Sequence, residues 1–134
     1  MRRSVAETLG APILAKYVHF RVVGVPPHIM GIGPAAAIPF LKDLSLAPDD
    51  VDVFEINEAF ASQALYSIRT VGIDINKVNP KGGAIAFGHP LGATGARQFS
   101  TLLTHLKASG KKIGVTSMCM GSGMGAACLV VSEQ

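Results

Sequence analysis

The sequence predicts an α/β domain whose sheet is mostly parallel and ends in an antiparallel hairpin. Three observations carry this prediction. Helical and strand-like segments alternate along most of the chain, as they do in βαβ units. Glycine or proline stands at most boundaries between these segments, where turns and helix ends form. Two apolar, strand-like runs close the chain with only a short glycine-rich turn between them, which favours a hairpin.

The first half of the chain predicts two helices and two strands. Residues 1–10 carry apolar side chains on one helical face, and residues 13–25 are rich in β-branched and aromatic side chains, which favours a strand. A helix over 34–46 begins with proline, where the missing N–H costs little, and Pro39 should bend it. A short strand over 51–56 follows.

The second half predicts two further helices before the hairpin. Residues 59–71 have apolar side chains at helical spacing, and the glycine that follows should end the helix. The same pattern, again closed by a glycine, predicts a helix over 96–109. Residues 113–120 and 126–132 are the two strands of the hairpin.

The length and composition fit one domain that shares part of its surface with another domain or subunit. A chain of 134 residues can build one real core but is short for two domains. Hydrophobic residues make up 49% and charged residues only 16%, which burial against a partner would explain. The net charge of +3, with no basic block among aromatics, argues against nucleic-acid binding. No apolar run is long enough to span a bilayer.

A glycine-rich, apolar loop is predicted over residues 82–97, and it contains His89. Such a density of glycine indicates tight turns or close approach of the backbone to something else. Pro90 restricts the backbone of His89, whose imidazole can move protons near neutral pH. Two interpretations remain open for His89: a hydrogen-bonded loop residue, which is the commoner case, and an acid–base group.

Asn57 stands at the junction between the strand 51–56 and the next helix. One interpretation is a helix N-cap, the usual role of asparagine at such a position. The other places its amide at the edge of the sheet, where ligands of α/β proteins gather. Both can hold at once, one through the backbone and the other through the side chain.

The two cysteines are expected to differ in role. Cys128 lies inside an apolar strand and fits a small buried side chain. Cys119 ends a strand before the glycine turn over 121–125, where free backbone N–H groups could face a ligand oxygen beside the thiol. Two cysteines make no disulfide framework, so a reducing compartment is the simpler interpretation.

Other classes of site are not indicated. The glycine turn lacks the spacing of G-x-G-x-x-G and precedes a strand, so nucleotide binding is rejected. His19, His28 and His105 lack partners at metal-ligand spacing. Arg97 is interpreted as a solvated residue at a helix start or as one member of a structural ion pair.

Three segments, taken together, are far more specific than any one of them. Asn57-Glu58-Ala59-Phe60-Ala61, Gly88-His89-Pro90-Leu91-Gly92 and Cys119-Met120-Gly121-Ser122-Gly123 resemble, in order and spacing, the C-terminal motifs of thiolases. The resemblance covers essentially the whole chain. Residues 24–35 are more similar to the peroxisomal 3-ketoacyl-CoA thiolases than to the mitochondrial or acetoacetyl-CoA type.

The resemblance implies a thiolase-like α/β/α layered domain with a mixed, mostly parallel sheet. Residues 1–134 would be a thiolase C-terminal domain that is incomplete at its N-terminal edge, without the strand that normally precedes its first helix. In thiolases the nucleophilic cysteine belongs to the N-terminal half, and no cysteine precedes Cys119 here. The chain is therefore expected to be a fragment that is inactive alone.

The resemblance also implies an activity, the thiolytic cleavage of 3-ketoacyl-CoA to acetyl-CoA and a shortened acyl-CoA in fatty-acid β-oxidation. His89 would activate the nucleophilic cysteine and help to hold the thioester oxygen of the departing enolate, while Asn57 would position a water that completes this oxyanion site. Cys119 would protonate the acetyl-CoA carbanion and later deprotonate the incoming CoA. The N–H of Gly121 would contribute to the oxyanion hole of the covalent intermediate. Such a reaction needs a base, a proton donor and preset oxyanion donors.

The implied partners are acyl-CoA and CoA as substrates, the missing thiolase N-terminal half, and further copies of the full-length protein in a homo-oligomer. No cofactor or metal is implied, and the subtype implies a peroxisomal location, with cytoplasm or mitochondrion as the other compartments. A noncatalytic, truncated thiolase-like interaction module is the alternative function. A biosynthetic condensing enzyme is a weaker one, because the Cys119 motif has no obvious counterpart there.

Overall fold

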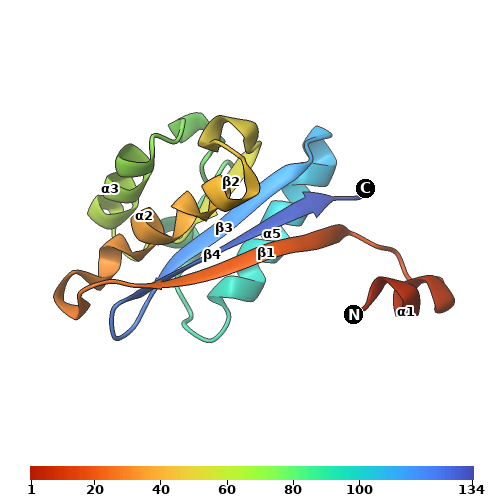
Figure 1. Ribbon diagram of the computed structural model, residues 1–134, viewed down its shortest axis with the longest axis horizontal. Helices are drawn as coiled ribbons and strands as arrows, with labels where there is room; N and C mark the ends of the chain where they lie inside the picture. Colours follow the sequence, from red (N-terminus) through yellow and green to blue (C-terminus); the bar gives the residue numbers. More distant parts are fainter.

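The computed structural model describes residues 1–134, which are built around a four-stranded sheet with strand order β1-β4-β3-β2 (Figure 1). The strands are β1 (Ala15–Gly24), β2 (Val53–Ile56), β3 (Ile113–Met120) and β4 (Met124–Ser132). All four strands lie within or close to the segments predicted from the sequence.

The sheet is mixed, as expected, but the prediction that it is mostly parallel is wrong. Only β2 and β3 pair in parallel, whereas β3 pairs with β4 and β1 pairs with β4 in antiparallel fashion. The hairpin of β3 and β4 is confirmed. The error concerns β1, which does not lie beside β2 but continues the hairpin on its far side, with Ala15 opposite Ser132.

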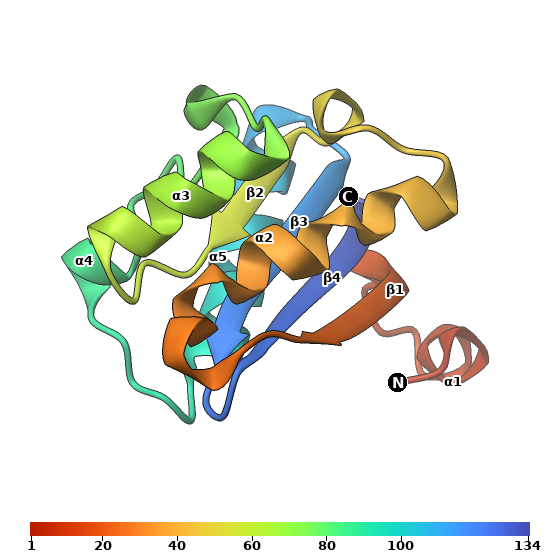
Figure 2. The same cartoon turned by 60° about the vertical axis from the view of Figure 1, so that its left-hand side comes forward.

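Helices cover both faces of the sheet and give the three layers that were expected. The α-helices are α1 (Arg3–Thr8), α2 (Gly33–Ala37), α3 (Ala61–Val71), α4 (Ala84–Phe87) and α5 (Thr94–Ser109), and 3-10 helices span Pro27–Ile32, Ile38–Leu44, Pro48–Asp50 and Ile75–Lys77. Figure 2 shows α2 and α3 on one face of the sheet and α5 on the other. None of these helices has the length and hydropathy needed to cross a membrane.

Strand β2 lies at an edge of the sheet, yet both of its faces are buried because its alternating side chains enter two separate cores. On β2, Phe54 and Ile56 pack with the layer of α2 and α3, whereas Val53 packs with Leu102 and Leu106 of α5. All four residues of β2 are buried. This double burial holds the end of β2, and the residues that follow it, in a fixed place.

Local backbone chemistry explains most of the helix boundaries. Helices α3 and α5 end at Gly72 and Gly110, both in the left-handed conformation, as the sequence predicts. The single bent helix expected over 34–46 is wrong, because α2 gives way to a 3-10 helix at Ile38. Pro39 cannot donate a backbone hydrogen bond or carry an α-helix past this point.

Candidate functional site

The carboxyl ends of β2 and β3 meet at one end of the sheet because these two strands are parallel. Ile56 lies opposite Ser117, and the next residue, Asn57, donates its backbone N–H to the Ser117 carbonyl at 2.9 Å. Cys119 stands two residues further along β3, and Gly121 begins the turn that follows. Three of the four predicted site residues thus lie where two adjacent strands end.

Asn57 is fully buried and contacts His89. Its Nδ2 lies 3.2 Å from His89 Nε2, whereas its Oδ1 is buried without a hydrogen-bond partner. The prediction that Asn57 caps a helix is wrong, because α3 begins only at Ala61 and Phe60 occupies the N-cap position. The amide is therefore available for a role at the edge of the sheet.

Two neighbours, Thr94 and Asn57, together indicate which nitrogen of His89 carries the proton. Thr94, the first residue of α5, donates its hydroxyl proton to the Pro90 carbonyl at 2.9 Å. Its Oγ1 lies 2.7 Å from His89 Nδ1. Because Asn57 Nδ2 can only donate to Nε2, the ring proton belongs on Nδ1, and the Thr94 oxygen accepts it. His89 is then protonated at Nδ1, and Nε2 presents a lone pair toward the Asn57 amide.

Thr94 is a residue of the site that the sequence did not indicate. The only signal was its position, since a hydroxyl at the start of α5 follows His89 by five residues. A first helical turn brings such residues close to the loop before it. Predicting this contact required the path of the loop, which composition does not give.

A buried ion pair supports the same strand end from the face of α5. Arg97 Nη1 lies 2.8 Å from Glu55 Oε2, so of the two interpretations of Arg97 the structural pair is correct. Burial raises the pKa of Glu55 from 4.5 to about 7, and the Arg97 guanidinium opposes this shift without cancelling it. Gln98, also buried, donates to the carbonyls of both Glu55 and Ser117 at 2.7 and 3.0 Å. Helix α5 thereby ties the ends of β2 and β3 together.

Cys119 and Gly121 lie at this end of the sheet but do not hydrogen-bond to Asn57 or His89. The Cys119 thiol is partly buried and free, and burial raises its pKa. The backbone N–H of Gly121 donates to no group of the chain. Cys128 is buried and free, and burial raises its pKa to about 11, which agrees with the inert role expected of it.

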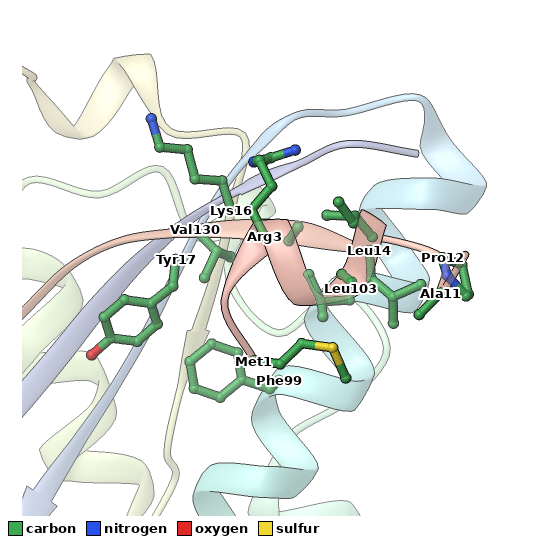
Figure 3. Close-up of a pocket in the computed structure, with 13 residues that line it drawn as sticks. Met1, Arg3, Ala11, Pro12, Leu14, Lys16, Tyr17, Phe99, Leu103 and Val130 are labelled. Carbon is green, nitrogen blue, oxygen red and sulfur yellow. The ribbon is translucent and has the colours of Figure 1, made fainter. Parts of the chain in front are cut away.

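The remaining features lie elsewhere. A largely apolar pocket of about 480 Å³ lies under α1, between β1 and α5, and Figure 3 shows Tyr17, Phe99 and Leu103 among the side chains that line it. It is near the start of β1 and contains none of the predicted site residues. No three His, Cys, Asp or Glu side chains are grouped as metal ligands would be.

The chain is similar to known proteins over nearly its whole length. The chain is 75% identical to the peroxisomal 3-ketoacyl-CoA thiolase of Yarrowia lipolytica, over 99% of this chain and 32% of that protein. It is 61% identical to the peroxisomal 3-ketoacyl-CoA thiolase of Saccharomyces cerevisiae, over 98% of this chain and 31% of that protein. The chain thus spans about a third of the length of the curated relatives it matches.

Solved structures show the same fold. The crystal structure of the dimeric peroxisomal thiolase of Saccharomyces cerevisiae superposes with a TM-score of 0.92 at 61% identity, covering 98% of this chain and 34% of that one. Human mitochondrial 3-ketoacyl-CoA thiolase superposes with a TM-score of 0.94 at 42% identity, with the same coverage. A family model described as thiolase, C-terminal domain, matches residues 11–132. The chain belongs to the thiolase family, in the part that this C-terminal domain represents.

Proposed function

We propose that this chain is the C-terminal part of a 3-ketoacyl-CoA thiolase, an acetyl-CoA C-acyltransferase of fatty-acid β-oxidation. The observation that carries the proposal is the contact between Asn57 Nδ2 and His89 Nε2, at the end of the sheet where Cys119 also lies. The reaction needs no cofactor, because coenzyme A is a substrate. The nucleophilic cysteine would come from a thiolase N-terminal half, so we expect the chain alone to be inactive.

In the proposed reaction His89 begins as a base. Once the Asn57 amide no longer donates to Nε2, the Nε2 lone pair takes the proton of the nucleophilic cysteine, and the resulting thiolate attacks the 3-keto carbon of the substrate. The bond between C2 and C3 then breaks, C3 becomes the carbonyl of an acyl-enzyme thioester, and the electron pair passes to the enolate of acetyl-CoA. The protonated imidazole and a water held by Asn57 stabilise the enolate oxygen. The buried, unpartnered Asn57 Oδ1 leaves one amide group free for such a water.

Cys119 would supply the acid–base group for the second part of the reaction. Its thiol protonates the enolate carbon and releases acetyl-CoA, and the resulting thiolate then removes the thiol proton of the incoming CoA. CoA attacks the acyl-enzyme and leaves with the shortened acyl chain. Burial raises the pKa of Cys119, which keeps the thiol protonated at neutral pH, as a proton donor requires. The free N–H of Gly121 supports its proposed place in the oxyanion hole.

The proposed protein partner is a thiolase N-terminal half. Strand β1 lies at an edge of the sheet and exposes the apolar side chains of Val18, Phe20 and Val22, a surface that another domain would cover. We further propose a homo-oligomer for the full-length protein, in line with the relative from Saccharomyces cerevisiae described as dimeric. The peroxisomal relatives support a peroxisomal location.

A thiolysis assay on a 3-ketoacyl-CoA tests the proposal, with the chain alone and mixed with a thiolase N-terminal half. We expect activity only in the mixture. Cys119→Ala should reduce it by about 10²- to 10⁴-fold, the usual contribution of a positioned proton donor. Cys128→Ala is the matched control and should retain activity. If the protein is well folded and neither sample shows thiolysis, the noncatalytic interaction module is favoured instead.

A further inference from the structure

A hydrogen-bond network joins the two segments that carry Asn57 and His89, and its members have no place in the reaction above. At its centre is Asn79, which follows the 3-10 helix Ile75–Lys77. Its φ is 46°, a left-handed conformation that asparagine tolerates better than most residues. The backbone turns at this residue, and the Asn79 carbonyl accepts the N–H of Gly82 at 2.8 Å.

Asn79 takes the place of a neighbouring strand along the free edge of β2. Its backbone N–H donates to the Phe54 carbonyl at 2.8 Å. Two residues further along β2, its side chain continues the pattern: Oδ1 accepts the N–H of Ile56 at 2.9 Å, and Nδ2 donates to the Ile56 carbonyl at 2.8 Å. One side-chain amide thus satisfies both backbone groups that an adjacent strand would satisfy. Ile56, the residue before Asn57, is held between this amide and β3.

The second proton of Asn79 Nδ2 extends the network toward His89. It is donated to Glu58 Oε1 at 2.8 Å, and Glu58 Oε2 accepts the N–H of Ile85 at 3.1 Å. Ile85 lies in α4, which ends two residues before His89. Gly83 admits the carboxylate, because a Cβ at that position would lie 2.3 Å from the Glu58 carboxyl carbon. The carboxylate therefore fixes α4 relative to β2.

We propose that Asn79 is a positioning residue that sets the contact between Asn57 and His89. It acts on Asn57 through Ile56, and on His89 through Glu58 and α4. The inference rests on the proposed function for the catalytic meaning of that contact. Only an amide fits the position, because one acceptor and two donors are needed at once. A carboxylate there would face the Ile56 carbonyl and the Glu58 carboxylate without a proton to donate.

The variant Asn79→Asp, which has nearly the same shape, tests the proposal in the full 134-residue chain. NMR detects the N–H···N hydrogen bond through the scalar coupling between Asn57 Nδ2 and His89 Nε2. We expect this coupling to be lost and solvent exchange of the Asn57 Nδ2 protons to become faster. Asn76→Asp is the matched control, since Asn76 Nδ2 bonds only the exposed Asp74. It should leave both signals unchanged.

Activity provides a second readout in the mixture with a thiolase N-terminal half. Asn79→Asp should lower kcat by about 10- to 100-fold, as loss of a supporting hydrogen bond does, with little change in the KM for 3-ketoacyl-CoA. Adding Glu58→Gln supplies a donor toward the new carboxylate and should recover part of kcat. If no protein shows thiolysis, the proposed function has failed, while the NMR result still decides the role of Asn79.

A folded Asn79→Asp chain that keeps the coupling between Asn57 and His89 would overturn the proposal. If this variant does not fold, Asn79→Gly is measured in the same way, because glycine retains the left-handed backbone and removes the amide. If both variants unfold while the Asn76→Asp control folds, Asn79 supports the whole fold and not the site. That result also overturns the positioning role.

Discussion

The tautomer of His89 follows from its contacts with Thr94 and Asn57. Thr94 Oγ1 can accept the Nδ1 proton only because its own proton is donated to the Pro90 carbonyl. The lone pair of the ring then lies on Nε2, where the Asn57 amide nitrogen contacts it at 3.2 Å. At this scale the position of the ring proton depends on neighbouring side chains that hydrogen-bond to the ring.

Replacing Thr94 by valine keeps the shape of the side chain and removes this acceptor. We expect the free energy of unfolding to fall by about 1–3 kcal/mol, because the Nδ1 proton of His89 loses its partner. The Nε2-protonated tautomer should also become populated. ¹⁵N chemical shifts of the imidazole and urea denaturation measure the two effects. Thr94→Ser keeps the hydroxyl and should resemble the parent; a valine variant with an unchanged tautomer would contradict the assignment.

The predicted site residues and the unpredicted ones differ in where their partners lie. Asn57, His89 and Cys119 each carry a local sign in the sequence, such as a strand end or a glycine-rich turn. Thr94 and Asn79 carry none, because their roles depend on groups brought near by the fold: Asn79 bonds Ile56, 23 residues earlier. Asn57 does not cap α3 because this helix begins further along the chain than the cap would require. The ends of helices are the part of a sequence-based prediction that is least certain.

Among the elements, β2 and α5 share a buried charge. Glu55 is completely buried, and its pKa of about 7 lies above the value of 4.5 that the exposed group has. Between these two values the folded chain binds a proton that the unfolded chain has released. The contribution of Glu55 to stability therefore falls as the pH rises from 4.5 to 7.

Urea denaturation across this pH range tests the assignment. The parent chain should lose stability on the order of 1–3 kcal/mol from this group between the two pH values. Glu55→Gln removes the titrating group, so its stability should change less with pH than that of the parent. Identical pH dependence of the two proteins would show that Glu55 does not titrate in this range.

The contact between α4 and the residues after β2 leads to a second prediction about how these elements are held together. Gly83→Ala places a methyl group where the Glu58 carboxylate lies and should displace it from Asn79 and Ile85. We expect a loss of about 1–3 kcal/mol in the free energy of unfolding. In a Glu58→Ala background the same change should cost much less, which a double-mutant cycle measures.

Gly92→Ala is the matched control for this change. It lies in the same loop, has no positive φ, and has open space around its would-be Cβ. Equal costs at positions 83 and 92 would show that the effect arises from glycine in general and not from Glu58. The sequence indicated close approach of the backbone somewhere in this loop, but not to which group, and the four-residue α4 carries too short a pattern to predict.

In the whole molecule, the two edges of the sheet differ in whether their backbone groups are covered. The edge at β2 is occupied at Ile56 by the side chain of Asn79, whereas β1 is an open edge of ten residues with apolar side chains exposed. An open apolar edge favours association. The alternation of helices and strands predicted a mostly parallel sheet and did not indicate that β1 forms this edge. Pairing between strands that are distant in the chain leaves no periodic signal in the sequence.

The chain alone should therefore self-associate through β1. Sedimentation velocity is expected to show a sedimentation coefficient that rises with protein concentration. Phe20→Lys, at a residue that is 49% exposed, should suppress this rise without unfolding the protein. Ile75→Lys makes the same change at a residue that is 57% exposed near the other edge, and should not. Suppression by both variants would point to general charge repulsion.

The order of strands in the sheet also has a consequence for synthesis. The first strand of the chain pairs with the last, since Ala15 lies opposite Ser132. During translation β1 is synthesised more than one hundred residues ahead of β4. It therefore stays unpaired until the rest of the domain has been synthesised. Contacts of such long sequence separation form slowly. Because β1 is apolar and stays unpaired for the longest time, we expect chaperones that bind nascent chains to bind this strand.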